Sequence, residues 1–502
     1  MITSRCTRAL FSLGAITLTL YATSPASAQE LSEDQKLTAG DAAQLDLLGF
    51  SVSVSGNSAV IGAPGENGTV GSVYVFDTTT GTQQIKLTAD SAFTTGTFGN
   101  SVSVSGNIAV VGAPATNAPS FREGDAYVFD TTTGQQLFRL LASDRQPLDQ
   151  FGYSVSVSGN TAVIGTLTAG AAYVFDTTTG QELFKLTPND AGGSFGETVA
   201  VSGSIAVVGA PTDLEQGANA GAAYVFDTTT GTQLFKLFSN DIAPEDRFGT
   251  SVSISGSIAV IGATGDDDAG PRTGAAYVFD TTTGQQLFKL KALDPGSENR
   301  FGRSVSVSGS TAVVGSDGES YIFDTSSGTQ LFKLTASDFE SGDAFGWSVG
   351  ISGSTAVIGA QANDDAGTNS GSAYAYLLSP SILQQPVGVV VNPGETAVFN
   401  IVAGNAADVQ YQWRRGGIPL VDAGNISGAT TPTLSIVADV SDEGAYDCLV
   451  TAAPGGPETQ SVPVVLAVLT DANPCVADLN GDGVLNFFDV SVFLSAYSAG
   501  CP

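Results

Sequence analysis

The chain has 502 residues, of which 61 are glycine, and 49 Asp and Glu against 18 Lys and Arg give it a formal net charge of −31. This length allows several domains, and abundant glycine with many Val, Ser and Thr residues favours strands and tight turns over helices. So acidic a balance repels nucleic acid and anionic lipid, which excludes these partners.

Residues 1–28 have the pattern of a secretory signal. Arg5 and Arg8 precede the apolar run ALFSLGAITLTL, and Ala26-Ser27-Ala28 forms a small-residue cleavage site. No later segment offers the roughly 18 uninterrupted apolar residues that a membrane helix needs. We therefore expect a secreted, extracellular or cell-surface protein without a membrane span.

A sequence motif of sixteen residues occurs in seven similar copies in the next part of the chain. The copy at residues 151–166 is FGYSVSVSGNTAVIGT, and each unit contains four strand-like runs, such as SVSVSG, TAVIG, AAYVFD and QELFKL. Units 44 to 53 residues long with four strands are typical of propeller blades, and they begin at Leu48, Phe98, Phe151, Phe195, Phe248, Phe301 and Phe345. Residues 29–380 are therefore predicted to form a seven-bladed β-propeller in an all-β protein.

The seventh unit lacks its fourth strand, because it stops after SAYAYLLSP. The matching sequence, QKLTAGDAAQLDLLG, lies at residues 35–49. We expect the strand at residues 35–41 to complete the last blade and close the ring, which removes an open sheet edge.

Two kinds of repeated or clustered aspartate have a structural interpretation. The turn DTTTG begins with an Asp that can bond its own backbone, so we interpret these residues as turn formers and not as catalytic carboxylates: Asp77, Asp130, Asp176, Asp227 and Asp280. The acidic stretches Asp266-Asp267-Asp268 and Asp364-Asp365 lie between the second and third strands. We interpret them as solvated loop charge.

The FG pair followed after a spacer by GAP resembles the FG-GAP repeat of integrin-α-type β-propellers. GAP occurs at residues 62–64, 112–114 and 209–211, and the resemblance covers residues 35–378. Several blades of that family carry a calcium loop, D-x-[DN]-x-D-G, between the first two strands. Here that connection is SGN or SGS in every unit, so no calcium site is predicted in the propeller.

Residues 381–470 contain a second pattern. Trp413 is followed 35 residues later by Cys448, within the motif D-x-G-x-Y-x-C. This pattern resembles the immunoglobulin fold, a β-sandwich in which Trp413 is the core tryptophan and Tyr446 the corner tyrosine. Ile401 stands where the partner cysteine would be, so we expect Cys448 to be a buried free thiol.

The segment 471–502 has the spacing of a calcium loop. The expected oxygen ligands occupy loop positions 1, 3, 5, 7, 9 and 12, and they are Asp478, Asn480, Asp482, Val484 through its carbonyl, Asn486 and Asp489. The run DVSVFLSAY predicts the helix that follows. The element resembles a dockerin-type, EF-hand-like loop, although a dockerin has two such loops and this chain has one. A solvated Asn- and Gly-rich tail is the alternative.

Two cysteines flank the calcium loop. Cys475 precedes it and Cys501 follows it. In an exported protein, we expect them to form a disulfide that stabilises the loop.

The position after each FG-like pair differs in every unit, although the positions that follow are nearly constant. If SVSVSG is the innermost strand, these seven side chains start the inner strands and can form a ring around one mouth of the central channel. They are Phe50, Asn100, Tyr153, Glu197, Thr250, Arg303 and Trp347. Their flat apolar faces and oriented polar groups suit a sugar or a peptide side chain. Drift at a solvent-exposed strand start is the alternative.

The chain contains no histidine, which excludes His-based triads, imidazole bases and His-ligated zinc. No Asp/Glu pair stands apart from the turn and loop carboxylates, as glycoside hydrolysis would need. The expected function is therefore non-catalytic binding or adhesion, with an extracellular protein or glycan as the partner and calcium in the C-terminal loop. The alternatives are an extracellular carbohydrate-active enzyme or its lectin-like companion, and a structural envelope or matrix component.

Overall fold

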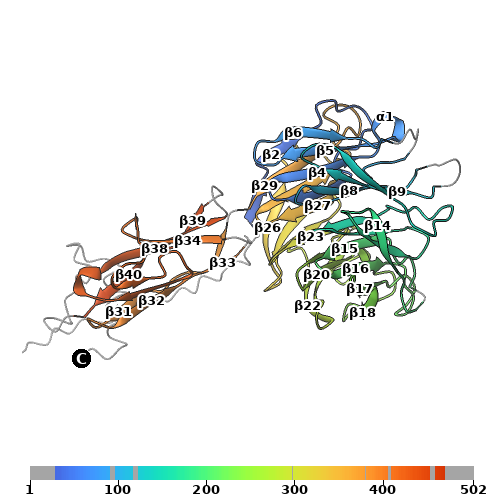
Figure 1. Ribbon diagram of the computed structural model, residues 1–502. Helices are drawn as coiled ribbons and strands as arrows, with labels where there is room; N and C mark the ends of the chain where they lie inside the picture. Colours follow the sequence, from blue (N-terminus) through green and yellow to red (C-terminus); the bar gives the residue numbers. More distant parts are fainter. Residues whose placement is uncertain are drawn as a thin grey trace, which may run out of the picture.

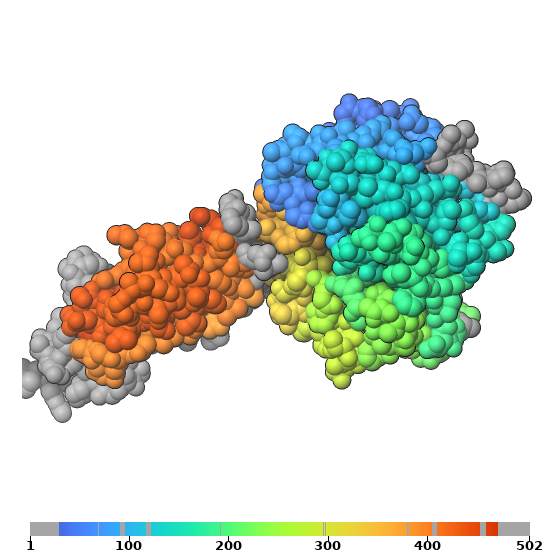
Figure 2. Space-filling model, viewed as in Figure 1, coloured from blue at the N-terminus to red at the C-terminus, as the bar shows by residue number. Residues whose placement is uncertain are grey.

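The computed structural model describes residues 29–469, apart from 91–95, 117–121, 191, 295, 297, 379, 405–408 and 453–457. Within these ranges, the only helical elements are α1 (Glu66–Thr69) and the 3-10 turn η1 (Val440–Asp442), so the prediction of an all-β protein is confirmed. The strands form a ring of sheets and a smaller body, which are separate lobes in Figures 1 and 2. The expected signal, the calcium loop and the Cys475–Cys501 pair lie outside the described residues.

The ring consists of seven blades, and in blades 1 to 5 each sheet is antiparallel with four strands that follow one another in the chain. Blades 6 and 7 each also include a strand from the N-terminal part of the chain. Blade 1 contains β3 (Ser51–Ser55), β4 (Ser58–Ala63), β5 (Ser72–Asp77) and β6 (Thr82–Leu87). Blades 2 and 3 contain β7 (Ser101–Ser105), β8 (Ile108–Ala113), β9 (Asp125–Asp130), β10 (Gln136–Leu140), β11 (Val155–Ser158), β12 (Thr161–Gly165), β13 (Ala172–Asp176) and β14 (Gln181–Leu186). Blades 4 and 5 contain β15 (Thr198–Ser202), β16 (Ile205–Ala210), β17 (Ala222–Asp227), β18 (Thr232–Leu237), β19 (Phe248–Ser255), β20 (Ile258–Ala263), β21 (Ala275–Asp280) and β22 (Gln285–Leu290). Blades 6 and 7 contain β23 (Ser304–Ser308), β24 (Thr311–Gly315), β25 (Ser320–Asp324), β26 (Thr329–Thr335), β27 (Phe345–Ser352), β28 (Thr355–Ala360) and β29 (Ser372–Leu377).

Blade 7 takes its fourth strand from the N-terminal part of the chain. β2 (Gln35–Leu37) pairs antiparallel with β29, with Gln35 opposite Ala375 and Leu37 opposite Ala373. This is the closure that the incomplete seventh unit indicates. A further strand, β1 (Gln29–Ser32), pairs in parallel with β26 and gives blade 6 five strands, which the repeat pattern did not predict.

The alternating Ser and Val residues of the inner strands join neighbouring blades. Val102 and Val104 of β7 are buried in a core shared with blade 1, and the N–H of Val104 donates to Ser53 Oγ across that boundary at 3.0 Å. The boundary between blades 7 and 1 has equivalent contacts. There the N–H of Gly56 donates to Ser352 Oγ at 3.0 Å. The ring therefore closes through the same bonds that join its other blades.

The glycines of FG and GAP allow the blades to approach closely. A Cβ atom on Gly62 of β4 would lie 2.0 Å from the carbonyl oxygen of Gly99 in the next blade, which no side chain tolerates. Gly99 itself has a φ of +90°, a conformation that favours glycine. Beside it, Phe98 packs edge-on against Tyr127 at a centroid distance of 5.6 Å. The FG-GAP pattern is thus explained by backbone contact between blades and by aromatic packing within them.

The DTTTG turns have the expected structure. In blade 1, Asp77 Oδ1 accepts the hydroxyl of Thr79 at 2.5 Å and the N–H of Thr79 at 2.8 Å, and these bonds lower the pKa of Asp77. The same N–H bond forms at the other four predicted positions, Asp130, Asp176, Asp227 and Asp280. Their interpretation as turn residues is confirmed.

The two ends of the ring differ. We call the end at which the inner strands begin the mouth face, and it is marked by the residues after the FG-like pairs, Phe50, Asn100, Tyr153, Glu197, Thr250, Arg303 and Trp347. In blade 7, Ala360 pairs with Phe345 and with Ser372 at the mouth face. Thr355 pairs with Leu377 at the opposite end. β29 therefore finishes on the face opposite the mouth.

The smaller body consists of β30 (Ser381–Gln384), β31 (Val389–Val391), β32 (Thr396–Asn400), β33 (Val402–Gly404), β34 (Val409–Arg415), β35 (Ile418–Pro419), β36 (Ile426–Ser427), β37 (Thr433–Val437), β38 (Gly444–Ala452), β39 (Glu458–Gln460) and β40 (Val464–Val468). Its larger sheet has the order β31-β40-β38-β34-β35, with β39 on β38, and another has the order β32-β37-β36. Trp413 from the first of these sheets and Phe399 from the second lie in one buried core. The body is therefore a β-sandwich.

Two expectations for this sandwich hold in the structure. Tyr446 is buried and donates its hydroxyl to the carbonyl of Asp442 at 2.7 Å. Cys448 is a buried free cysteine, and burial raises the pKa of its thiol to about 12. Ile401 lies in the same core. Among the described residues, no helix is long and apolar enough to span a bilayer.

Candidate functional site

A cavity of about 530 Å³ opens at the mouth face. All seven residues that the sequence singles out line it, and each comes from a different blade: Phe50, Asn100, Tyr153, Glu197, Thr250, Arg303 and Trp347. Each of these side chains is half-buried. The structure therefore brings the whole predicted ring together, and ligand binding by this ring stays a prediction.

A tight turn directs these side chains into the cavity. In blade 1 the N–H of Phe50 donates to the carbonyl of Leu47 at 3.1 Å, and in blade 6 the N–H of Arg303 donates to the carbonyl of Arg300 at 3.0 Å. The glycine before Phe50 has a φ of +86°, as the third position of a type II turn requires. The residue that opens each turn is also left-handed, as at Leu47 and Arg300. The FG-like pair thus acts as a bend that aims the next residue at the channel.

Further residues of the cavity come from the connections between strands. They are Glu245 and Arg247 before β19, Thr264, Gly265 and Arg272 between β20 and β21, and Arg300 before β23. These connections vary in length and sequence, so no repeated motif points to them. Three of these six residues are arginines, and positive charge is scarce in a chain with 18 Lys and Arg residues.

Trp347 has less free surface than the sequence suggests. The guanidinium of Arg303 lies over its ring, with Cζ 3.6 Å from the centroid. The Phe50 ring is 5.8 Å away at an angle of 51°. Arg303 also donates from Nη1 to Asp317 Oδ1 at 3.3 Å. One face of Trp347 is therefore occupied by Arg303, and the expectation that this residue offers an open flat face is corrected.

The opposite part of the ring carries a carboxylate. Burial raises the pKa of Glu197, and Arg247 opposes that shift. Burial also raises the pKa of Tyr153, with a further contribution from Glu197. Within the described part of the chain, no hydrogen bond or ion pair is formed by the Glu197 carboxylate. Asn100 Nδ2 donates to the carbonyl of Tyr153 at 3.2 Å, which ties two neighbouring members of the ring together.

A separate acidic cluster lies on blade 5. The carboxylates of Asp241, Asp266 and Asp268 approach within 4.8 Å of one another, as metal ligands do. The ammonium of Lys289 lies among them, at 2.7, 2.6 and 2.7 Å. Asp266 is 3% exposed and also accepts the Tyr277 hydroxyl. The interpretation of Asp266 as solvated loop charge is therefore wrong, because it is the buried partner of a lysine.

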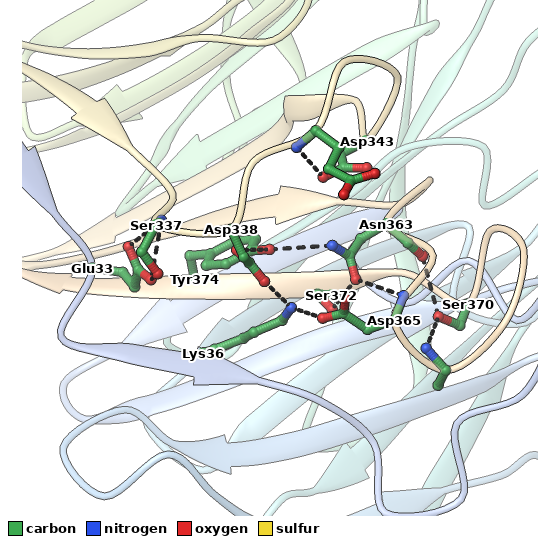
Figure 3. A network of polar contacts seen from close by, with 12 residues as sticks. Glu33, Lys36, Ser337, Asp338, Asp343, Asn363, Asp365, Ser370, Ser372 and Tyr374 are labelled. Carbon is green, nitrogen blue, oxygen red and sulfur yellow. Dashed lines mark hydrogen bonds and ion pairs between the residues drawn. The ribbon is translucent and has the colours of Figure 1, made fainter.

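Blade 7 has a network of the same kind (Figure 3). Lys36 of β2 contacts both Asp338 and Asp365, and the hydroxyl of Tyr374 donates to Asp338 Oδ1 at 2.8 Å. Asp365 is accordingly an ion-pair partner as well as a loop residue. The lysine arrives on the strand that closes the ring, so closure completes this network.

The chain belongs to the FG-GAP repeat family. Seven segments match it, and together they cover more than half of the chain: residues 31–76, 82–129, 135–175, 181–226, 232–279, 285–330 and 328–376. The segment 82–129 starts on β6 of blade 1 and ends on β9 of blade 2. The sequence repeat is therefore displaced by one strand from the blade, which is why the last blade needs a strand from the beginning of the chain.

Three of the solved structures that match the chain illustrate its similarity to known folds. Hydrazine synthase of Kuenenia stuttgartiensis is 14% identical, with a TM-score of 0.45 over 64% of this chain and 94% of that chain. The β-propeller domain of Cps50 (Swd1) from Myceliophteria thermophila is 12% identical, with a TM-score of 0.45 over 68% and 99%. The titin M10–obscurin-like 1 Ig complex is 27% identical, with a TM-score of 0.16 over 18% and 93%. A comparison with curated proteins found no match.

Proposed function

We propose that the chain is an exported, non-catalytic binding protein that holds an extracellular glycan or protein side chain in the cavity of its propeller. One observation supports this most strongly. Seven different residues occupy one structural position and line one cavity, whereas the residues that join the blades are nearly constant. Variation concentrated on a cavity wall is what a scaffold that presents a specific site requires.

The C-terminal modules support an extracellular role. The buried Trp413 and the Tyr446 bond to Asp442 agree with an immunoglobulin-like domain at residues 381–470. We propose that the segment 471–502 adds a dockerin-like calcium element. A binding propeller joined to two such modules is an arrangement suited to a surface or matrix protein.

A second candidate is a carbohydrate-active enzyme. Glu197 and Glu245 both line the cavity, and a glycoside hydrolase needs two carboxyl groups that flank the scissile bond. The raised pKa of Glu197 would suit an acid. Release of reducing ends from a bound glycan would favour this function.

A glycan array with the purified full chain, with and without EDTA, is the first test. It identifies a ligand and shows whether calcium is needed. Binding without turnover is the expected result. Reducing-end release would instead favour the enzyme.

The variants Trp347→Ala and Arg303→Ala then locate the ligand. Both should weaken binding at least about tenfold, because Trp347 holds the Arg303 guanidinium and loss of a charged hydrogen bond costs roughly 1.5–3 kcal/mol. Arg122→Ala is the matched control, since Arg122 is exposed and does not line the cavity. Unchanged affinity in both cavity variants, with the fold intact, would remove the cavity from consideration.

A further inference from the structure

We propose that the cavity selects an oxyanion, and that its ligand is an acidic sugar unit whose carboxylate or sulfate group meets a crescent of arginines. This inference rests on the proposed binding function and adds the chemical class of the ligand. Four arginines line the cavity, Arg247, Arg272, Arg300 and Arg303. The whole chain has a net charge of −31, so such a gathering of positive charge runs against its composition.

The arginines lie on one side of the ring. Arg247 and Arg272 belong to the connections around blade 5, and Arg300 and Arg303 belong to blade 6 and the turn before it. The lining also contains Glu197 and Glu245, so its formal charge is 4 − 2 = +2. Asp317, which contacts Arg300 and Arg303 from outside the lining, reduces the local sum to 2 − 1 = +1. A positive, partly desolvated pocket on an acidic protein concentrates field lines and attracts anions locally.

Arg303 is the anchor of the crescent. The Arg303 side chain is half-buried, its guanidinium lies over the Trp347 ring, and its Nη1 donates to Asp317. Arg300 contacts the other oxygen of the same aspartate, with Nε 3.7 Å from Oδ2. A guanidinium has five N–H donors in a rigid fork that matches carboxylate, sulfate and phosphate oxygens. Trp347 therefore orients the Arg303 guanidinium, in which Nη1 already donates to Asp317 and the other N–H groups can donate to a ligand.

The other blades provide partners for hydroxyl groups. Glu197 on blade 4 is a half-buried carboxylate that forms no hydrogen bond or ion pair among the described residues, although Arg247 is close enough to oppose the rise in its pKa. It can accept a ligand O–H. Asn100, Tyr153 and Thr250 add neutral polar groups. A cavity of about 530 Å³ has the size of small-ligand sites and can hold one or two sugar rings. An oxyanion at one end and hydroxyls at the other describe a uronate or a sulfated sugar.

The test is isothermal titration of the full-length chain with a short hexuronate oligosaccharide, a neutral hexose oligosaccharide of equal length and its sulfated counterpart. We expect both acidic ligands to bind at least about tenfold more tightly than the neutral one, since charge-assisted bonds to arginine are worth roughly 1.5–3 kcal/mol. The stronger of the two shows whether carboxylate or sulfate is the natural group. Binding should weaken from low to high salt, because three of the four cavity arginines are exposed to solvent: Arg247, Arg272 and Arg300.

Two variants place the effect on the arginines. Arg303→Lys keeps the charge and loses the fork, so it should weaken binding of the acidic ligand by a larger factor than binding of the neutral one. Arg272→Gln should do the same more weakly. Its matched control is Arg122→Gln, because Arg122 has the equivalent left-handed loop position in blade 2 and does not line the cavity.

The outcomes separate this inference from the proposed function. Equal affinity for acidic and neutral sugars, abolished by Trp347→Ala, would overturn the oxyanion site and keep a binding cavity. Acidic binding that Arg303→Lys and Arg272→Gln leave unchanged would also overturn it, because the anion would then bind elsewhere. Failure of all three sugars to bind would overturn both proposals for glycan ligands.

Discussion

The ammonium of Lys289 lies among three carboxylates, in the position that a metal ion would take. An ammonium has three donors, and here they reach Asp241, Asp266 and Asp268. Burial lowers the pKa of Lys289, but the hydrogen bonds that its ammonium donates to these carboxylates outweigh burial and raise the pKa. A fixed internal charge thus balances acids that would otherwise repel one another or recruit a metal ion.

Replacing Lys289 with a neutral residue should leave the three carboxylates without a counter-charge. We expect Lys289→Met to destabilise the ring by roughly 1–3 kcal/mol, less than for a fully buried pair because Asp268 is half exposed. Thermal melting measures the loss, and millimolar calcium should restore part of it in the variant only. Lys185→Met is the control, since Asp144 is the one carboxylate with which the described structure pairs Lys185. Equal losses in the two variants would contradict the role of the cluster.

Asp246 is an acid held away from solvent. It is 4% exposed, and its Oδ2 accepts the N–H of Ala243 at 2.7 Å. Burial, with smaller contributions from Asp266 and Asp267, raises its pKa from 3.8 to about 6. Between these two pH values the folded state therefore holds a proton that the unfolded state has released.

This shift predicts a pH dependence of stability. A raised folded pKa favours the protonated fold, so the contribution is complete below about pH 3.8 and is lost as pH rises through about 6. Asp246→Asn keeps an oxygen acceptor without the charge. It should match the parent at pH 3.5 and exceed its stability at pH 7 by roughly 1–3 kcal/mol.

Denaturant unfolding between pH 3.5 and 7.5 measures this difference. The comparison variant is Asp280→Asn, whose carboxylate has a pKa lowered by bonds from Thr282. That variant should lose stability at pH 7 instead of gaining it. A constant difference between parent and Asp246→Asn at all pH values would refute the assignment.

At the scale of strands, the ring depends on contacts that are local to each blade boundary. Inner strands bond to their neighbours through serine hydroxyls, as at Ser53 and Val104. The glycine of each FG-like pair meets the glycine that ends or nearly ends the second strand of the preceding blade, as Gly99 meets Gly62. At the last boundary, Ser348 Oγ donates to the carbonyl of Gly49 at 2.8 Å. The first and last blades are therefore joined by the same type of hydrogen bond as other neighbouring blades.

Removing the closing strand should weaken the whole ring. Deletion of residues 29–47 exposes the edge of β29 and takes Lys36 away from Asp338 and Asp365. We expect a lower melting temperature and a single cooperative transition, measured by calorimetry. Deletion of residues 29–32 removes β1 alone and should have a smaller effect, because β2 stays in place. If the longer truncation melted like the parent, the closure argument would be wrong.

The strand pattern could be predicted because the same strand-forming sequence occurs in seven copies. The blade count, the closing strand and the seven cavity residues all follow from the phase of one sixteen-residue phrase. β1 could not be predicted, since QELS lies outside the repeat and its parallel pairing depends only on where the chain enters the ring.

The side-chain networks were missed for a different reason. The partners of Lys289 come from separate connections, so each looks like surface charge until folding brings them together. In the same way, the sequence places Arg303 and Trp347 on one ring but does not show that one covers the other. Arg247, Arg272 and Arg300 lie in connections between strands that carry no repeated motif, so the sequence did not point to them.

At the scale of the whole molecule, calcium should bind at one place. In the described blades, lysines occupy the acidic clusters of blades 5 and 7, and the predicted ligands of the C-terminal loop include Asp478 and Asp482. Calcium requires six to eight oxygen ligands, and the sequence predicts such a set in the C-terminal loop only. We therefore expect titration of the full chain to give one calcium per chain. Asp482→Ala should abolish this heat, and reduction of the predicted Cys475–Cys501 bond should weaken it.

The matched control for this titration is Asp422→Ala in the sandwich, which removes one carboxylate and leaves the calcium loop unchanged. Calcium heat that persists in Asp482→Ala would contradict the loop assignment. Heat that disappears in Asp422→Ala would place the metal in the sandwich instead.

The direction of β29 has a consequence for attachment. Since this strand finishes on the face opposite the mouth, the link to the sandwich leaves the ring there, and β2 also runs from that face toward the mouth. A molecule immobilised through its C-terminal modules would point its cavity toward the surrounding medium. A bulky polymer could then dock head-on without meeting the tether, and neighbouring molecules on one surface would all offer their binding sites in the same direction.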